Sequence, residues 1–358
     1  DLSVSNPTEA GLAFDQGGLL KQLTSPEALH YQPTSAGLSS ARRAVALHHA
    51  QLTGTRVDAE QVLLTASTSE AYAYLFKLLC DPGDCVWTPR PGYPLFDMLA
   101  QLEGVETLRY DLHYDGRWSL APDALLDTLG ARAVIAVSPS NPTGNCLQQW
   151  ELDRMLQTGL PVICDEVFSS YLHQQDEGAL RTVHGGQRGL TFCLGGLSKQ
   201  AGLPQLKLAW IIVGGEPARA AESLERLSWI ADAYLSPSAP VQHAAERLLE
   251  TGKARQAQIQ QRCHQNLQWL RERFERCDHC DLLHTEAGWY ACLRVPATQD
   301  DEAWCLELLR EAGVRLQPGY FYDMQGGAHL IISLLTPRET LRQGVERVQA
   351  QVLRSIGR

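Results

Sequence analysis

Four short polar segments lie at the ends of apolar stretches of the chain, and each carries a group that could do chemistry. They read Thr-Ala-Ser-Thr-Ser-Glu at residues 65–70, Ser-Pro-Ser-Asn-Pro-Thr-Gly at 138–144, Val-Ile-Cys-Asp-Glu-Val-Phe at 162–168 and Gly-Gly-Leu-Ser-Lys at 195–199. If the apolar stretches are parallel strands, their carboxyl ends share one edge of a sheet, and open α/β sheets bind their ligands at that edge.

The four segments offer different groups. Hydroxyls and backbone N–H groups at the start of the helix after residue 65 could hold an anion, although they would also suit an ordinary helix cap. Asn141 offers an amide, within what could be only a Pro-Gly turn. Asp165 offers a carboxylate that closes a buried strand and so needs a partner. Lys199 offers an amine, although a lone lysine in a loop usually faces solvent.

The elements that would position these groups alternate along the chain. Strands are predicted at residues 62–65, 85–88, 133–137, 161–165, 191–194 and 207–213, because these runs are apolar on both faces. Helices are predicted between them at residues 69–80, 95–102, 122–129, 148–157 and 217–229. This alternation predicts an α/β fold with a mostly parallel sheet between helices.

The remainder of the chain has a different pattern. A long helical region is predicted at 240–277, followed by a helix at 301–313, a strand at 329–334 and a closing helix at 338–356, which together indicate a small α+β domain. The loop-like first 35 residues are expected to pack on that domain or on a partner subunit. We predict a large domain over residues 38–255 and a small one formed by 1–37 and 256–358.

Composition excludes several function classes. The chain has 358 residues, 44% of them apolar, and a net charge of −10, which disfavours a nucleic-acid binder. No apolar run reaches the length of a membrane span. The ten cysteines form no regular disulfide framework, which predicts a reducing, cytoplasmic location. Cys277 and Cys280 form a single C-x-x-C, which is weak evidence for zinc, so we predict no metal site.

Taken together, the segments resemble the fold-type-I pyridoxal-phosphate enzymes, and most nearly the class I/II, aspartate-aminotransferase-like group. The resemblance rests on the order of Asn-Pro-Thr-Gly at 141–144, Asp-Glu-Val at 165–167 and Ser-Lys at 198–199, and it runs from Tyr31 to the C-terminus. Further matches are Pro-Gly-Tyr-Pro at 91–94, Ser-Pro at 236–237 with Gln242, and Gln-Pro-Gly-Tyr-Phe at 317–321. The resemblance implies a large domain with a seven-stranded type of sheet and a small α+β domain.

The resemblance also implies a role for each matching residue. Lys199 would form a Schiff base with pyridoxal 5'-phosphate and, once released, move the substrate's proton. Asp165 would pair with the pyridine nitrogen, Asn141 would bond the phenolic oxygen, and Tyr93 would stack on the ring. Residues implied for the phosphate are Thr68, Ser69, Ser198, Lys207 and, from the neighbouring subunit, Tyr31. The last of these implies a homodimer with shared active sites.

Three positions depart from the family's pattern. Lys207 stands where the family has an arginine on the phosphate, which keeps the charge but loses the two-pronged hydrogen bonding. Phe168 replaces a tyrosine, so that Asn141 would be the main donor to the phenolic oxygen. Ile331 takes the place of the arginine that binds the substrate carboxylate. Candidate replacement cations by sequence neighbourhood are Arg90, Arg315 and Arg338.

Three functions remain open at this point. The first is an aminotransferase that moves an amino group between an amino acid or amine and a keto acid, with no nucleic-acid or membrane partner. The second is a lyase, a decarboxylase or other amino-acid side-chain chemistry on the same scaffold, which the loss of the arginine favours. The third is the effector-sensing half of a transcription regulator, which is disfavoured because no helix-turn-helix segment precedes Tyr31.

Overall fold

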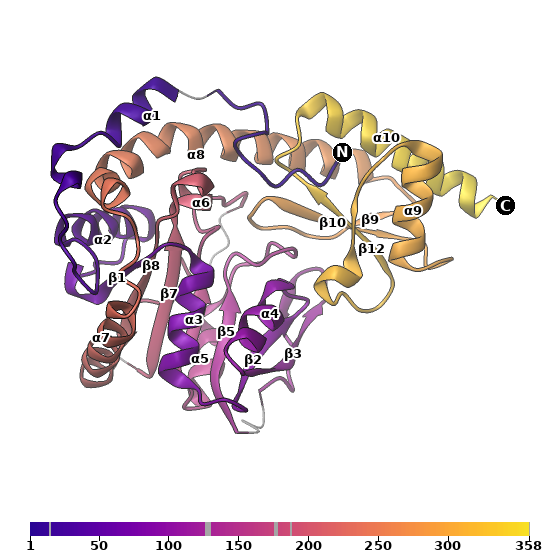
Figure 1. Cartoon of the computed structure of the whole chain (residues 1–358). Coiled ribbons are helices and arrows are strands. Elements are labelled where there is room, and N and C mark those ends of the chain that lie inside the picture. The colour runs from indigo at the N-terminus through magenta and orange to yellow at the C-terminus, as the bar shows by residue number, and fades with distance from the viewer. Residues whose placement is uncertain (14–15, 126–129, 175–177, 187, 358) are drawn as a thin grey trace.

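An open, mostly parallel sheet runs through the larger part of the molecule (Figure 1). The computed structural model describes residues 1–13, 16–125, 130–174, 178–186 and 188–357. Within these residues the sheet has eight strands in the order β1-β8-β7-β6-β5-β2-β3-β4. Strands β7, β6, β5, β2 and β3 are parallel to one another, whereas β8 is antiparallel to both β1 and β7, and β4 is antiparallel to β3. The strands are β1 (Val62–Thr65), β2 (Cys85–Arg90), β3 (Glu106–Tyr114), β4 (Trp118–Leu120), β5 (Ala131–Val137), β6 (Val162–Asp165), β7 (Leu190–Gly196) and β8 (Ala209–Gly215).

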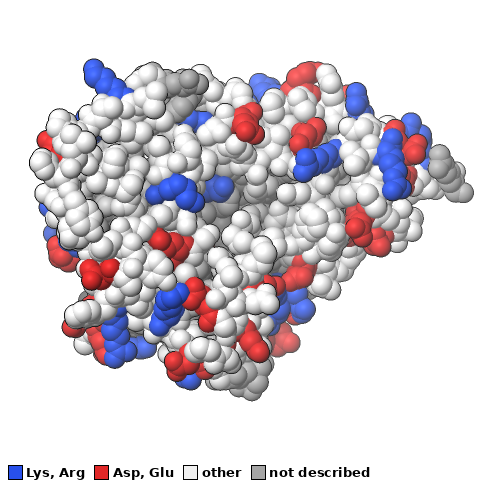
Figure 2. All heavy atoms as spheres, in the orientation of Figure 1, with Lys and Arg blue, Asp and Glu red and all other residues white. Residues whose placement is uncertain are grey.

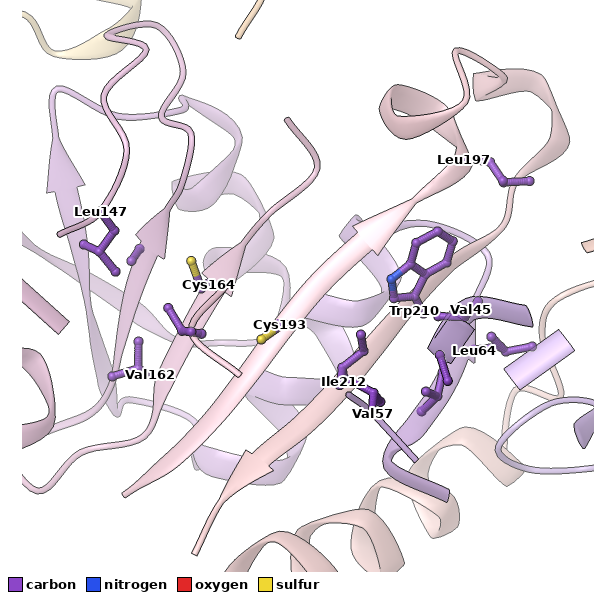
Figure 3. Packing of buried hydrophobic residues seen from close by; sticks show 14 of the residues in the cluster. Val45, Val57, Leu64, Leu147, Val162, Cys164, Cys193, Leu197, Trp210 and Ile212 are labelled. Atoms are coloured by element: carbon purple, nitrogen blue, oxygen red, sulfur yellow. The ribbon is translucent and has the colours of Figure 1, made fainter. Parts of the chain in front are cut away.

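Helices cover both faces of this sheet. Successive strand residues point to opposite sides, and both sets are apolar, so each face needs a layer of helices to bury it. In β6, Val162 and Cys164 join the core under α2, α5 and the first turns of α8 (Figure 3), whereas Ile163 joins the core under α3, α4 and α7. These helices are α2 (Ser39–Thr53), α3 (Thr68–Leu79), α4 (Leu95–Leu102), α5 (Gln149–Gln157), α7 (Pro217–Asp232) and α8 (Ala239–Phe274). Both faces of the strands are therefore apolar, as the sequence predicts.

A second, antiparallel sheet forms a separate core. In the described part of the chain its order is β11-β12-β10-β9, and α9 and α10 pack on it. Its elements are β9 (Asp281–Leu282), β10 (Tyr290–Val295), β11 (Gln317–Pro318), β12 (Ala328–Ser333), α9 (Asp301–Ala312) and α10 (Arg338–Ile356). Leu2 extends this core from the N-terminus, because its N–H donates to Arg315 O at 2.9 Å and its carbonyl accepts from Ser333 N at 2.8 Å.

Helix α8 joins the two cores. Its 36 residues place Val241–Leu249 in the core of the large sheet and Ile259–Phe274 in the core of the small one. In Figure 1 it runs below α1 across the upper part of the molecule, from the side of the large sheet toward the small sheet. The predicted domain boundary at residue 255 lies inside this continuous helix, and the division into two domains stays a prediction. None of the described helices is both long and apolar enough to cross a membrane.

The architecture confirms the predicted fold class, and β4 adds an eighth strand to the seven-stranded type. Other differences are local. The helix predicted at 122–129 forms turns over residues 122–125, and residues 126–129 lie outside the described part. Strand β8 begins at Ala209 rather than at Lys207, because Lys207 has a left-handed φ of 51°.

The first 35 residues contain two short helices, α1 (Gln16–Gln22) and a 3₁₀ turn (Pro26–Leu29). The remaining short helices are α6 (Leu197–Gln200) and three 3₁₀ turns, Ala59–Gln61, Pro204–Leu206 and Gly319–Tyr322.

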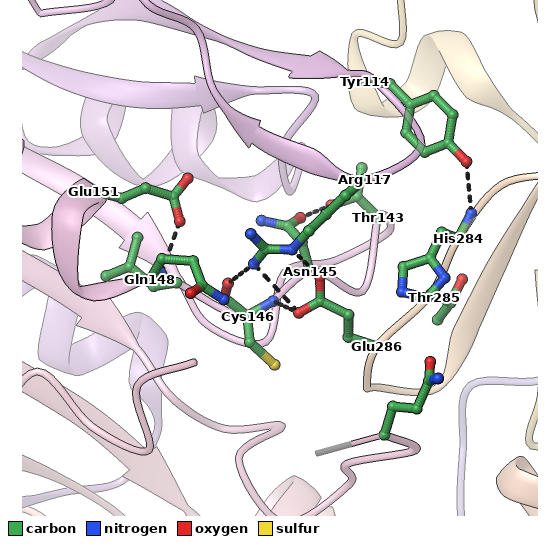
Figure 4. Close-up of polar contacts among 12 residues, drawn as sticks. Tyr114, Arg117, Thr143, Asn145, Cys146, Gln148, Glu151, His284, Thr285 and Glu286 are labelled. Carbon is green, nitrogen blue, oxygen red and sulfur yellow. Dashed lines mark hydrogen bonds and ion pairs between the residues drawn. The ribbon is translucent and has the colours of Figure 1, made fainter. Parts of the chain in front are cut away.

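An ion pair ties the loop after β5 to the small sheet (Figure 4). The side chain of Glu286 is 2% exposed and accepts from Arg117 Nε and, at 2.9 Å, from the backbone N–H of Cys146. Arg117 also donates to Cys146 O at 2.8 Å. The carbonyl of Gly144 accepts from the N–H groups of Glu286, at 3.1 Å, and of Ala287, at 2.9 Å. The loop that carries Asn141 is therefore held from both sides.

Gly144 is required by this close approach. Its φ is +71°, and a Cβ there would lie 2.6 Å from Ala287 O and 2.6 Å from Thr285 Cγ2. Any side chain would push the segment before β10 away from the loop, since neither contact involves the free end of a flexible side chain.

Glu286→Gln should therefore destabilise the fold. The variant keeps the shape of the side chain but removes the negative charge that the guanidinium of Arg117 meets at Glu286, at a cost of about 1–3 kcal/mol in the free energy of unfolding. Urea unfolding followed by circular dichroism measures this loss. The matched control is Glu222→Gln, which breaks the exposed pair of Glu222 with Arg226 and should change stability by no more than about 0.5 kcal/mol. Equal, small losses in both variants would contradict a structural role for Glu286.

Candidate active site

The carboxyl ends of three neighbouring parallel strands meet where the sequence places Asn141 and Asp165. Val137 at the end of β5 pairs with Asp165 at the end of β6, which pairs in turn with Leu194 of β7. Backbone hydrogen bonds continue this register, since Ser138 N donates to Asp165 O at 3.0 Å and Glu166 N donates to Leu194 O at 2.9 Å. The loop after β5 therefore begins beside the carboxylate that closes β6.

The glycine pair before Lys199 lets β7 pack closely against β8. A Cβ on Gly195 would lie 2.4 Å from Trp210 Nε1, and one on Gly196 would lie 3.1 Å from the Cβ of Ala209. Ala209 also pairs with Thr65 of β1. The starts of α3 and α6 therefore lie at the same edge of the sheet as Asp165.

Lys199 lies in the single turn of α6, largely buried. Tyr171 donates its hydroxyl hydrogen to Lys199 O and so holds the backbone of the turn. Burial lowers the pKa of the Lys199 amine, and the negative charge of Asp165 opposes this effect. No described carboxylate forms an ion pair with Nζ, which instead lies over the indole ring of Trp289. A buried amine with a lowered pKa is suited to act as a nucleophile or a base.

Asp165 is buried, and burial raises the pKa of its carboxyl to about 6. The N–H of Val167, which donates to Oδ1 at 3.1 Å, acts in the opposite direction, as do the charge of Lys199 and the hydroxyl of Tyr72. Glu166 beside it is engaged elsewhere, because its Oε1 accepts from Val183 N at 2.7 Å. Asp165 is therefore the acid that can receive a cation at this edge.

Asn141 and Tyr93 complete the centre of the site. Asn141 is buried, and its Oδ1 has no hydrogen-bond partner among the described residues. Tyr93 is 39% exposed, packs edge-on against Phe96 with 5.9 Å between ring centroids, and lies near enough to Asp165 for that charge to help raise the pKa of its hydroxyl, after burial.

The residues implied for a phosphate lie at the starts of two helices. Ser67 caps α3 by accepting from Glu70 N at 3.1 Å, and the half-buried Thr68 and Ser69 follow it, where backbone N–H groups have no partner within the helix. Ser198 is half-buried in α6, and Lys207 is exposed just before β8. Tyr31 is 78% exposed, and no hydrogen bond, ion pair or ring contact among the described residues joins it to the other groups of the site.

These groups fit pyridoxal phosphate. Two helix starts suit the phosphate, Asp165 suits a protonated ring nitrogen, and a buried amide with an unpartnered oxygen suits a polar ligand beside Asn141. Figure 2 shows a hollow in the surface near the place that α6 occupies in Figure 1, with basic side chains beside it.

Ile331 faces this site from the small sheet. It is 1% exposed and lies opposite Cys292, whose thiol contacts Pro142 O at 3.5 Å, so their shared face is turned toward the loop of Asn141. None of the three candidate cations is an evident replacement. Arg90 forms a two-pronged pair with Asp111, at 2.5 and 2.8 Å, while Arg315 and Arg338 are exposed.

Sequence reasoning missed three aromatic residues of the site. Tyr72 lies one helical turn after Ser69, and that spacing could have placed it on the sheet-facing side of α3. Tyr171 and Trp289 gave no such signal, because only tertiary packing brings them to Lys199.

Comparison with known proteins agrees with this geometry. Nicotianamine aminotransferase 1 of Oryza sativa subsp. japonica is 23% identical over an alignment that covers 89% of this chain and 67% of that protein. Tyrosine aminotransferase of Bos taurus is 22% identical over an alignment that covers 97% of this chain and 80% of that protein. The structure of an alanine aminotransferase from Pyrococcus furiosus has the same fold, with a TM-score of 0.86 at 21% identity, over 99% of this chain and 92% of that one.

A family model extends the likeness over nearly the whole sequence. Residues 6–348 match the description "Aminotransferase class I and II". This span includes both sheets and every residue at the carboxyl edge of the large one. The chain therefore belongs to the class I and II aminotransferase family.

Proposed function

We propose that the protein is a pyridoxal-phosphate-dependent aminotransferase that moves an amino group between an amino acid or amine and a keto acid. The observation that carries this proposal is the placing of a half-buried Lys199 amine, which forms no ion pair with a described carboxylate, within the electrostatic reach of the buried carboxylate of Asp165. Membership of an aminotransferase family supports the same reaction.

When bound, the cofactor supplies an aldehyde carbon and a ring that withdraws electron density from the substrate. Lys199 Nζ would hold the aldehyde carbon. After the substrate amine displaces it, the free amine would take the proton from the substrate Cα and deliver it to the carbon that carried the aldehyde. Asp165 would keep a proton on the pyridine nitrogen, because the carboxylate and the protonated nitrogen each favour the charged form of the other. Asn141 would bond the phenolic oxygen, and Tyr93 would cover one face of the ring.

The phosphate would lie between the starts of α3 and α6. Thr68, Ser69 and Ser198 offer hydroxyl and N–H donors there, and Lys207 adds a positive charge.

The exposed Tyr31 would complete the site of a second copy of the chain, so we propose a homodimer. We propose a cytoplasmic location as well, and the two-domain division at residues 37/38 and 255/256.

A second function is favoured by one observation. An apolar Ile331 on the face turned toward Asn141 leaves no cation at a position where the family binds a carboxylate. Elimination or decarboxylation on the same scaffold would remain possible with the same cofactor residues. Without any acceptor, elimination would release ammonia and a keto acid, and decarboxylation would release carbon dioxide and an amine, so either result would distinguish this function from transamination.

The proposed role of Lys199 predicts a covalent label. Borohydride reduction of the cofactor-loaded protein should fix a phosphopyridoxyl group on Lys199, and mass spectrometry of its peptides locates that group. Lys199→Ala should abolish the label, whereas Lys253→Ala, a change at an exposed helix position, should leave it in place. A label on another lysine of the unchanged protein would overturn the assignment.

The proposed homodimer predicts complementation between inactive variants. In a mixture of Tyr31→Phe and Lys199→Ala, each hybrid dimer holds one site with both changes and one with neither, so up to about a quarter of the activity should appear. As a control, Asp165→Asn and Lys199→Ala affect the same chain's site and should not complement. A monomer in sedimentation, or equal results from both mixtures, would argue against a shared site.

The apolar Ile331 predicts poor binding of simple amino acids. A carboxylate beside Ile331 would lack a charge-assisted interaction of about 1.5–3 kcal/mol, so transamination of alanine and aspartate should be weak. Ile331→Arg should lower their KM by about tenfold or more if the strand accommodates it, and Ile331→Leu is the control for altered packing. Rapid turnover of alanine at low KM by the unchanged enzyme would show that another group binds the carboxylate.

A further inference from the structure

The amine of Lys199 lies on an aromatic face rather than beside an acid. Its Nζ is 5.2 Å from the centroid of the Trp289 ring, within the range of about 6 Å in which an ammonium is attracted to the negative face of an indole. Trp289 is fully buried, so water competes little for this contact.

Backbone bonds on both sides of Trp289 fix its place. Gly288 N donates to Tyr171 O at 2.8 Å, and the carbonyl of Trp289 accepts from Leu334 N at 2.7 Å. The ring meets Phe168 at 5.3 Å and 71° and Tyr171 at 5.1 Å and 67° between centroids and planes. Its Nε1 has no hydrogen-bond partner among the described residues. Packing alone therefore sets the direction of the indole face.

Tyr171 links the two partners. Its ring packs edge-on against Trp289, and its hydroxyl donates to the backbone carbonyl of Lys199. One side chain thus fixes both the turn from which the lysine projects and the ring on which its amine rests.

Within the described residues, Asp165 is the one charged group whose electrostatic effect reaches Lys199. The charge of Asp165 also helps to raise the pKa of the hydroxyls of Tyr72 and Tyr93, after burial. A carboxylate in contact with Nζ would hold its proton strongly and oppose its use as a base. An aromatic face attracts the ammonium more weakly and leaves no competing anion when the amine is neutral.

We propose that Trp289 is a positioning residue for Lys199, whose indole face holds the ammonium by a cation–π contact and so directs the amine without an ion pair. The inference rests on the proposed function of Lys199. It also gives the large, fully buried Trp289 a purpose within the site: the lysine, when it is free and charged, has one defined resting place.

The test measures the protonation of Lys199 in the whole chain after the cofactor has been released from the lysine with hydroxylamine and removed by dialysis. Lys199 is methylated with formaldehyde and cyanoborohydride over a range of pH, and peptide mass spectrometry gives its rate relative to Lys253. The readout is the midpoint of the rate against pH, because this midpoint reports loss of the proton, whereas easier access would raise the rate at every pH alike.

Trp289→Leu removes the aromatic face, and Trp289→Phe keeps a smaller one. Because the contact favours the charged amine, its loss should move the midpoint to lower pH and raise the Lys199 rate below the midpoint by about three- to tenfold, with Trp289→Phe in between. Trp304→Phe is the matched control, since Trp304 is equally buried but donates Nε1 to Pro296 O at 2.9 Å, in the core of the small sheet. It should leave the midpoint unchanged.

A second measurement avoids any risk of misfolding. Replacing all eight tryptophans by trifluorotryptophan weakens the negative ring face with little change in shape, and it should lower the midpoint in the same direction as Trp289→Leu. An unchanged midpoint in the fluorinated protein, or equal midpoints for Trp289→Leu and Trp289→Phe, would overturn the proposal. Neither outcome affects the borohydride label on Lys199, so failure of this inference is distinguishable from failure of the proposed function.

Discussion

The charge on Glu286 constrains the arrangement of the whole site. A carboxylate with a side chain 2% exposed is tolerated only if its oxygens are satisfied. Its partners come from two other segments, the guanidinium of Arg117 from the turn between β3 and β4 and the N–H of Cys146 from the loop after β5. The small sheet, the edge of the large sheet and the loop of Asn141 must therefore assemble together, which couples the geometry of the site to the packing of the two cores.

Within this assembly, two ionisable groups of the site, Asp165 and Lys199, are shielded from water to a large extent. Burial raises the pKa of Asp165 and lowers that of Lys199, so it disfavours the charged form of each. For Asp165 the direction of the pKa shift determines how the stability of the fold depends on pH. A carboxyl with a folded-state pKa of about 6 favours folding at low pH, and this contribution is lost as the pH rises through 6. A cation that pairs with Asp165 at neutral pH would restore it, so that cofactor binding and folding support each other.

The sequence allowed the strands and the central residues to be predicted because both depend on local patterns. Runs such as 162–165 are apolar on both faces, and the order of the Asn, Asp and Lys motifs fixes their places at the ends of such runs. Helix α2 was missed because its buried face is made largely of alanine and histidine, which give a weak amphipathic signal. Strand β3 was missed although 108–114 alternates apolar and polar residues, as a strand with one exposed face does. Trp289 and Arg117 could not be predicted, because their partners are distant in sequence.

Helix α8 has a mechanical consequence. At 1.5 Å per residue its 36 residues form a rod about 54 Å long, with one end in each core. The N-terminal segment is bonded to this helix. Arg255 donates a hydrogen bond to Pro7 O at 2.9 Å, and Arg262 donates one to Ala10 O at 2.8 Å. If the end packed on the large sheet acts as a pivot, a tilt of about 5° displaces the far end by about 5 Å. A small rotation of α8 about its end in the large core would therefore produce a large displacement of the small sheet. The N-terminal segment, which is bonded to α8, would move with the helix.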